Sequence, residues 1–392
     1  MQAPPLAVYV HFPWCVSKCP YCDFNSHQLK SALPEAAYLE ALAADLAAQL
    51  LRVAGREVCS VFLGGGTPSL FAPSAIGEVL ALLRARLPFA PDAEITMEAN
   101  PATIERGRFA GYRDAGVNRV SLGAQSFGAA QLAALGRIHK VEDVLRSVDE
   151  LRRAGLVNFN LDLMFALPQQ GRELALADLA AALALAPSHL SLYQLTIEPG
   201  TVFAGHPPPL PNEEECEAMQ ADAQALLGAR GYAQYEVSAW AQAGFQCRHN
   251  RNYWSFGDYL GLGAGAHGKL THPGRGLIER SAHPREPRRY QAGAAQGPRW
   301  QAVAAADLPF EFMMNALRLN EGFTAADFSA RTGLDPAVIA PSFAQLAARG
   351  LAEPLPTGQG PGWRATALGH RFLNDVTAVF LPAPISQDGA GS

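Results

Sequence analysis

The sequence has no excess of positive charge, few lysines and no long hydrophobic run. Lys and Arg together number 31 against 36 Asp and Glu, so the net charge of -5 does not favour a nucleic-acid-binding protein. The longest stretch without a charged side chain, 179–197, contains Pro187 and several polar residues, and no membrane-spanning helix is expected. The N-terminus has neither the basic nor the apolar region of a secretory signal, which predicts a cytoplasmic location.

Cysteines are also scarce, but three of the six lie close together. Cys15, Cys19 and Cys22 form a C-x3-C-x2-C pattern, whereas a secreted disulfide framework would spread its cysteines along a small chain. Zinc usually takes four ligands, and no second C-x2-C pair completes such a site. A 4Fe–4S cluster held by three thiolates would leave one iron open to an external ligand. Of the other cysteines, Cys59 is expected in the core and Cys216, within an acidic run, on the surface.

Strand-like and helix-like patterns alternate over the first 240 residues. The expected strands cover 6–12, 58–63, 93–98, 118–123, 157–165 and 189–195, and the expected helices cover 35–54, 73–88, 103–115, 129–154, 172–186 and 212–230. This alternation predicts an α/β fold with parallel strands joined by right-handed crossovers. Six units fit either a doubly wound sheet or a partial TIM-like barrel, and the pattern alone does not choose between them.

The rest of the chain divides into three parts. Residues 241–300 are rich in Gly, Pro, Arg and His and are expected to be irregular. Residues 301–384 predict three helices and a two-stranded wing, as in a winged-helix module, but 301–392 contains five Arg, no Lys and eight acidic residues. Because a DNA reader needs cations against phosphates, this domain is interpreted as a packing or protein-contact module. Residues 385–392 are expected to form a flexible tail.

Polar and glycine-rich motifs follow the predicted strands, where ligands bind in α/β folds. They lie at 62–69, 97–101, 121–127, 135–139 and 160–168. With the cysteine loop, and in this order, they resemble the radical S-adenosylmethionine (SAM) superfamily, and within it the oxygen-independent coproporphyrinogen III oxidase-like (HemN-like) family. The resemblance runs from about 9 to 201 and continues more weakly to the C-terminus. It implies that 1–240 forms a partial (β/α)6 barrel, with Cys15, Cys19 and Cys22 holding a 4Fe–4S cluster whose open iron binds SAM.

The same resemblance implies a set of SAM-binding residues: Tyr9, Tyr21, Gly65, Gly66, Thr67, Glu98, Gln125, Arg137 and Asp162. Their types suit the task, because glycine lets a backbone approach a ligand, carboxylates and amides bind hydroxyl and ammonium groups, and a guanidinium pairs with a carboxylate. Without the family resemblance, the glycine run is typical of a tight turn, Glu98 and Asp162 of helix caps or turns, and Arg137 of the surface.

Two departures from the oxidase distinguish this sequence within the family. Phe24 stands where the oxidase carries a further cysteine, and only fourteen residues precede Cys15, where the oxidase has a longer segment. Both features, and the HNxxYW sequence at 249–254, resemble the HemW branch of heme chaperones. That resemblance implies heme as a third cofactor, delivery of heme to an apo-hemoprotein acceptor, with respiratory proteins among the candidates, and a separate electron donor for the cluster.

His249 is the leading candidate for a heme ligand. A neutral imidazole ligates heme iron. Tyr253 and Trp254 offer aromatic faces to a porphyrin, and Arg248 and Arg251 offer charges to its propionates. The alternative is a hydrogen-bonded structural histidine beside a cysteine that takes no part. If His249 is not the ligand, the next candidates are His11, His27, His267 and Cys247.

The sequence therefore predicts a heme chaperone with no assigned catalytic residue. The alternatives are an oxygen-independent coproporphyrinogen III oxidase, which forms protoporphyrinogen IX by means of a 5′-deoxyadenosyl radical, and a radical SAM enzyme acting on another substrate. Whether the chain is an enzyme stays open. The glycine-rich segment 261–268 mimics a dinucleotide-binding fingerprint, but no ribose-binding acid follows it in a βαβ unit, and no nucleotide is expected there.

Overall fold

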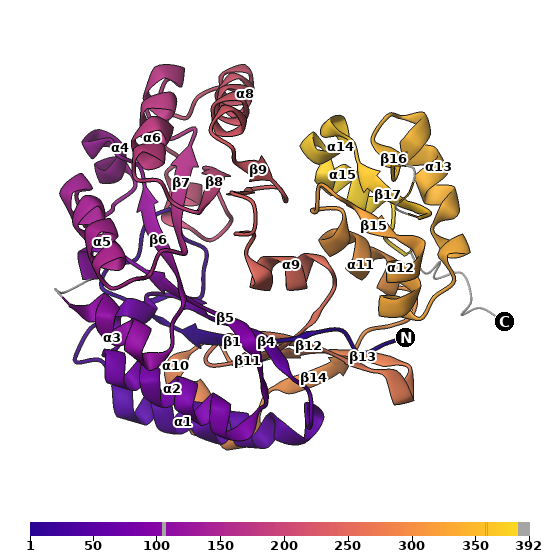
Figure 1. Ribbon diagram of the computed structural model, residues 1–392, viewed down its shortest axis with the longest axis horizontal. Helices are drawn as coiled ribbons and strands as arrows, with labels where there is room; N and C mark the ends of the chain where they lie inside the picture. Colours follow the sequence, from indigo (N-terminus) through magenta and orange to yellow (C-terminus); the bar gives the residue numbers. More distant parts are fainter. Residues whose placement is uncertain (104–106, 357, 359, 383–392) are drawn as a thin grey trace.

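The computed structural model describes residues 1–103, 107–356, 358 and 360–382, and its centre is a curved sheet with helices on the outside (Figure 1). Six strands run side by side in the order β1-β4-β5-β6-β7-β8. Their bounds are β1 Leu6–Phe12, β4 Val58–Gly65, β5 Phe89–Ala99, β6 Arg119–Gln125, β7 Phe159–Phe165 and β8 His189–Gln194. Every adjacent pair in this series is parallel, which confirms the predicted partial (β/α)6 barrel.

Helices cover the outer face of this sheet. Their bounds are α1 Glu35–Gln49, α2 Pro73–Arg86, α3 Arg108–Ala115, α4 Ala129–Ala134, α5 Val141–Arg153, α6 Arg172–Ala184 and α8 Glu213–Ala229. Strands buried on both faces need nearly continuous apolar runs. In β1, only Tyr9 is partly exposed, and its side chain lines a cavity inside the barrel. In the described part of the chain, no helix combines the length and hydrophobicity needed to cross a membrane.

The stretch 129–154 forms two helices rather than the single helix expected. A turn separates α4 from α5. Gly136 in this turn has a φ of 64°, and a side chain there would meet Pro20 of the cysteine loop at 2.8 Å. The predicted single helix is interrupted here because Gly136 has a left-handed backbone conformation and packs against the cysteine loop, where a side chain would not fit. The break directs Arg137 towards β6, where it binds a backbone carbonyl.

Cys216 on α8 is buried, contrary to the expectation from its acidic neighbours. It is 8% exposed and packs with Phe165 and Met219 in a small apolar cluster. The acidic side chains lie on other faces of the same helix, because residues one and two positions apart point in different directions. Sequence neighbours alone therefore gave the wrong exposure for this thiol.

Residues 241–300 are more regular than their composition suggests. The segment contains β10 Ala239–Ala241, α9 Arg248–Trp254, β11 Asp258–Leu262, β12 His267–His272, β13 Leu277–Ala282, α10 Pro287–Gly293 and β14 Arg299–Ala302. β11 pairs with β1 in parallel, and β12, β13 and β14 continue the sheet in antiparallel order. The strand pattern is not apparent from the sequence because glycines occupy positions where two strands come close together. A side chain at Gly261, for example, would lie 2.0 Å from the carbonyl oxygen of His267 on the next strand.

The C-terminal residues form a smaller unit (Figure 1, orange to yellow). Its elements are α11 Leu308–Ala316, β15 Phe323–Thr324, α12 Ala325–Thr332, α13 Ala340–Ala348, β16 Ala352–Pro354, β17 Gly362–Ala365, α14 Ala367–Arg371 and α15 Leu373–Ala378. The strands pair in the order β15-β17-β16, one strand more than expected. Phe312, Phe328 and Phe343 lie in a separate core, and an ion pair of 2.6 Å joins Arg251 to Glu321 of this unit. The predicted tail at 385–392 lies outside the described residues.

Candidate functional site

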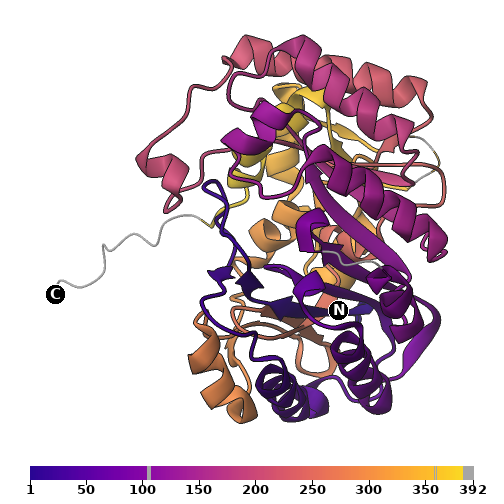
Figure 2. The same ribbon diagram turned by 90° about the vertical axis from the view of Figure 1, so that its left-hand side faces the viewer.

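The loop between β1 and α1 carries the three clustered cysteines. Two short strands, β2 (Trp14–Cys15) and β3 (His27–Gln28), pair and close its base. Figure 2 shows this loop (indigo) rising beside the segment that carries α7 (Val202–Gly205), where the Phe203 N–H donates a 3.0 Å hydrogen bond to the carbonyl of Pro20. The loop stands at the carboxyl ends of the parallel strands, the usual ligand-binding end of such barrels.

Each of the three thiols lies against a polar side chain. Thr67 Oγ1 donates to Cys15 Sγ at 3.3 Å, and Arg137 Nη1 donates to Cys19 Sγ at 3.6 Å. Cys22 Sγ lies 3.7 Å from a serine hydroxyl of the same loop. None of the three forms a disulfide. Donors directed at sulfur favour the thiolate, which is the form that ligates iron, so this set fits an iron–sulfur cluster.

A cavity of about 320 Å³, here called the cysteine cavity, opens beside this loop. Its walls combine the three cysteines with eight of the nine residues that the family resemblance implies for SAM. The eight are Tyr21, Gly65, Gly66, Thr67, Glu98, Gln125, Arg137 and Asp162. The ninth, Tyr9, lines a larger neighbouring cavity instead, and its hydroxyl lies 2.8 Å from His11 Nδ1.

The glycine turn after β4 is shaped by contact with the cysteine loop. Gly65 has a φ of 112°, and a side chain there would lie 2.4 Å from the His11 ring. At Gly66 a side chain would lie 2.6 Å from the carbonyl oxygen of Trp14, and the Gly66 N–H donates to the carbonyl of Phe12 at 2.7 Å. The positive φ and the adjacent His11 ring therefore require glycine at position 65, and the close approach of two backbones requires it at position 66, whatever ligand they also contact.

Two half-buried carboxyl groups face the cysteine cavity. Glu98 accepts a hydrogen bond of 2.9 Å from the Gly65 N–H. Burial, and then the neighbouring charge of Asp162, raises the pKa of Glu98 to about 8. Burial also raises the pKa of Asp162, although Asn160 and Ser121 donate hydrogen bonds to its oxygens. The pair therefore retains a proton near neutral pH and offers both a donor and an acceptor to a ligand.

Ionisation of Glu98 predicts a pH-dependent stability. Its folded pKa of about 8 exceeds the ordinary 4.5, so between these values the folded protein binds more protons than the unfolded chain. The free energy of unfolding of cofactor-free protein should fall by about 2–4 kcal/mol from about pH 5 to about pH 8, and Glu98→Gln should remove most of that slope. Urea denaturation across this range measures both, and equal slopes would exclude Glu98 as the responsible group.

Arg137 enters the cysteine cavity from the turn between α4 and α5. Its Nη2 donates to the carbonyl of Gly123 at 2.9 Å, and its Nε has no hydrogen-bond partner among the described residues. Although burial disfavours the charged form, Tyr21 and Cys19 hold the pKa of Arg137 above its usual value. Nearby, Gln125 has a φ of 66°, an unusual backbone for a residue other than glycine. A half-buried cation with a spare donor fits the carboxylate of an amino-acid ligand.

A second cavity of about 740 Å³, here called the aromatic cavity, adjoins the first. Asp23, Phe24, Gly65 and Glu98 line both. Its further walls are mostly aromatic or basic: Tyr9, His11, Tyr253, Trp254, Phe256, Tyr259, His267, Lys269, Arg280 and Arg285. No sequence motif singled out the two arginines. The glycine-rich segment 261–268 contributes Gly265 and His267 to the same cavity, but its glycines mimic a nucleotide fingerprint and do not indicate a heme site.

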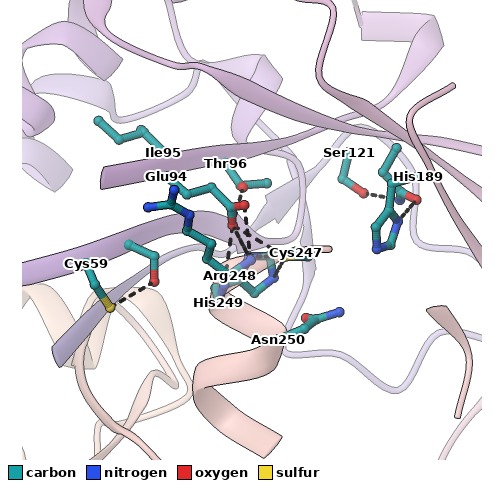
Figure 3. Close-up of polar contacts among 12 residues, drawn as sticks. Cys59, Glu94, Ile95, Thr96, Ser121, His189, Cys247, Arg248, His249 and Asn250 are labelled. Atoms are coloured by element: carbon teal, nitrogen blue, oxygen red, sulfur yellow. Dashed lines mark hydrogen bonds and ion pairs between the residues drawn. The ribbon is translucent and has the colours of Figure 1, made fainter. Parts of the chain in front are cut away.

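His249 is not among the described residues that line either cavity. It is 6% exposed and lies in a buried cluster with Glu94 of β5 and Cys247 (Figure 3). Its Nδ1 is 3.3 Å from Glu94 Oε1 and 2.8 Å from Cys247 Sγ, and its ring centroid is 4.0 Å from that of Phe62. Burial lowers the pKa of His249, which keeps the imidazole neutral. Its role as a heme ligand stays a prediction, and it requires the start of α9 to move.

Arg248, which precedes this motif, and Arg251 within it are also not among the described residues that line the aromatic cavity. Arg248 Nη2 pairs with Asp92 at 2.8 Å, and Arg251 Nη2 pairs with Glu321 of the C-terminal unit at 2.6 Å. Neither guanidinium is free to meet a propionate in the way that the sequence suggests. Tertiary ion pairs, which sequence spacing does not reveal, account for the difference.

Glu94 explains the position of α9. Both of its carboxylate oxygens accept hydrogen bonds from the Arg248 N–H at 3.1 Å, and Oε1 also accepts one from the His249 N–H at 3.3 Å. A carboxylate from β5 thus caps a helix that is distant in sequence. The first half of the HNxxYW motif anchors α9 to the barrel, while Tyr253 and Trp254 in its second half face the aromatic cavity.

Two family models match this chain. The radical SAM superfamily model matches residues 9–180, and the HemN C-terminal domain model matches residues 303–372. The solved structure of the coproporphyrinogen III oxidase HemN from Escherichia coli aligns with a TM-score of 0.79, covering 96% of this chain and 90% of that one. The sequence identity in this alignment is 24%, so it shows likeness of fold alone.

Relatives of similar length are closer in sequence. The heme chaperone HemW of Escherichia coli (strain K12) is 48% identical over 381 residues, which cover 97% of this chain and 99% of the relative. The heme chaperone HemW of Haemophilus influenzae is 45% identical over 384 residues, with coverages of 97% and 99%. The superfamily implies a 4Fe–4S cluster and SAM. At this identity and coverage, the chain belongs to the heme chaperone HemW family of the radical SAM superfamily.

Proposed function

We propose that this protein binds heme in the aromatic cavity and transfers it to an acceptor hemoprotein. The observation that carries the proposal is the make-up of that cavity, in which aromatic and basic side chains face one space of about 740 Å³. Heme is a flat apolar ring with two propionates, and it needs both kinds of wall. The relatives from Escherichia coli and Haemophilus influenzae carry the name heme chaperone, which supports the same ligand.

We further propose that the adjoining cysteine cavity holds the cluster and SAM. Cys15, Cys19 and Cys22 would ligate the cluster, Arg137 would bind the SAM carboxylate, and Glu98 would accept hydrogen bonds from SAM polar groups. When bound, the cluster and SAM supply one-electron chemistry. The chain contributes ligation, orientation and exclusion of water. A donor of electrons is the second partner that this proposal requires.

Arg137→Ala is expected to weaken SAM binding by more than about tenfold. Loss of a charged contact in a desolvated site costs about 2–5 kcal/mol. Equilibrium dialysis of reconstituted protein measures the affinity. Cluster content is measured in parallel, because Arg137 also contacts Cys19 Sγ. Arg146→Ala is the matched control, since Arg146 on α5 pairs with Asp143 at the surface, away from the cysteine cavity. Unchanged SAM affinity in both Arg137→Ala and Asp162→Ala would rule out this cavity as the SAM site.

Heme titration followed by transfer tests the proposed function. Anaerobically reconstituted protein is titrated with hemin, and the purified complex is then mixed with apomyoglobin as a general acceptor. A saturable Soret band at about one heme per chain, and its passage to the acceptor, is the expected result. In a separate reaction the protein is incubated with SAM, reductant and coproporphyrinogen III. Protoporphyrinogen formation without stable heme binding would identify an oxidase and overturn the proposal.

A further inference from the structure

The aromatic cavity contains an imidazole that no other described part of the protein engages. His267 is the first residue of β12, opposite Ala282 of β13, and its exposed side chain lies on the cavity wall. Among the described residues it has no hydrogen-bond or ion-pair partner. An unengaged imidazole between aromatic and basic walls is available to a ligand.

Three other histidines in this region are already engaged. The His11 ring lies 2.8 Å from a tyrosine hydroxyl and 2.9 Å from the carbonyl of Asn25, so both of its nitrogens have partners. His283 pairs with buried Asp45 at 3.1 Å. His249 is buried in the cluster at the start of α9. None of these rings can reach a ligand without losing a contact that the fold uses.

Packing explains the glycines around His267 but not His267 itself. A side chain at Gly261 would lie 2.0 Å from the His267 carbonyl, one at Gly265 would lie 2.3 Å from Asn25 Nδ2, and one at Gly268 would lie 2.5 Å from a serine hydroxyl. These glycines let β11, β12 and the cysteine loop approach one another. Packing does not require histidine at position 267, because the side chain there is exposed.

We propose that His267 is the axial ligand of heme iron in the aromatic cavity, an inference that rests on the proposed function. Arg285 lines the same cavity, and its side chain forms no ion pair within the described residues. Arg280 also lines it while bonded to Glu311 and the Tyr259 hydroxyl. The guanidinium of Arg285 binds a heme propionate, since a planar fork matches a carboxylate.

The charge state of His267 agrees with this role. Partial burial, and then the positive charges of Arg280 and Arg285, lowers the pKa of His267. The ring is therefore neutral at physiological pH, and a neutral ring nitrogen is the form that ligates iron.

The test compares heme with metal-free protoporphyrin IX in full-length, cluster-reconstituted protein. His267→Ala should change the Soret band and lower heme affinity by about tenfold or more, because the iron loses its ligand. The affinity of the His267→Ala protein for protoporphyrin IX should stay within about twofold of the wild-type value. Imidazole added to this variant should restore the wild-type heme spectrum. Arg285→Ala should weaken both porphyrins, because propionate binding does not depend on iron.

His249→Ala is the comparison variant, and thermal melting normalises each titration to folded protein. A wild-type Soret band per folded His249→Ala protein supports the inference. Loss of that band in His249→Ala, with an unchanged band in His267→Ala, overturns it. Absence of heme binding in the wild-type protein would sink the proposed function itself. Wild-type heme binding that His267→Ala leaves unaltered would refute only the ligand assignment.

Discussion

Replacing Cys15, Cys19 or Cys22 with alanine is expected to abolish the iron–sulfur cluster, leaving less than about a tenth of the wild-type iron and acid-labile sulfide. All three thiols line one cavity on one loop, and the cluster needs each of them as a protein ligand. Thr67 and Arg137 donate to two of these sulfurs, so the loss also leaves polar groups without their partners. Visible absorbance and metal analysis of anaerobically reconstituted protein measure the effect.

Cys59→Ala and Cys247→Ala are the controls for this experiment. Cys59 Sγ donates to the carbonyl of Leu6 at 3.3 Å, and Cys247 Sγ donates to Glu94 Oε1 at 3.4 Å. Neither lies among the described residues that line the cysteine cavity. Both variants should keep full cluster content per folded protein. Equal loss in either one would show that the three-ligand assignment is wrong.

The barrel and the cysteine site could be predicted because local sequence determines them. Cys15, Cys19 and Cys22 lie within eight residues, so their convergence needs only one loop. The strands are apolar because both of their faces are buried, and this leaves a pattern in the sequence itself. Arg137 also belongs to a short motif, at 135–139. The break in the helix at Gly136, which directs Arg137 into the cavity, is not apparent from the sequence because it lies within a helical pattern.

The aromatic cavity could not be predicted in the same way, because it depends on contacts between distant segments. The imidazole of His249 is held by Glu94, which lies 155 positions earlier in the chain. His267 stands in a segment whose glycines resemble a loop motif but serve strand packing. The motif predicts Tyr253 and Trp254 beside a porphyrin, and both line the aromatic cavity, whereas the ring of His249 in the same motif lies outside it.

Replacing Glu94 with alanine is expected to lower the free energy of unfolding by about 3–5 kcal/mol. The carboxylate is 7% exposed and caps the start of α9. Although burial alone would raise it, the hydrogen bond from His249 and the charge of buried Arg119 hold the pKa of Glu94 below its usual range. Removing Glu94 takes one compensating charge from buried Arg119 and leaves the first N–H groups of α9 without their acceptor.

Urea denaturation followed by circular dichroism measures this loss, and two variants of the same strand calibrate it. Glu94→Gln keeps an acceptor for α9 and should cost less than Glu94→Ala, because it removes the charge but not every hydrogen bond. Asp92→Asn removes only an exposed ion pair with Arg248 and should leave the midpoint almost unchanged. Because α9 carries Tyr253 and Trp254 into the aromatic cavity, heme affinity per folded protein should also fall in Glu94→Ala. A midpoint equal to that of Asp92→Asn would contradict the assignment of Glu94 as the anchor of α9.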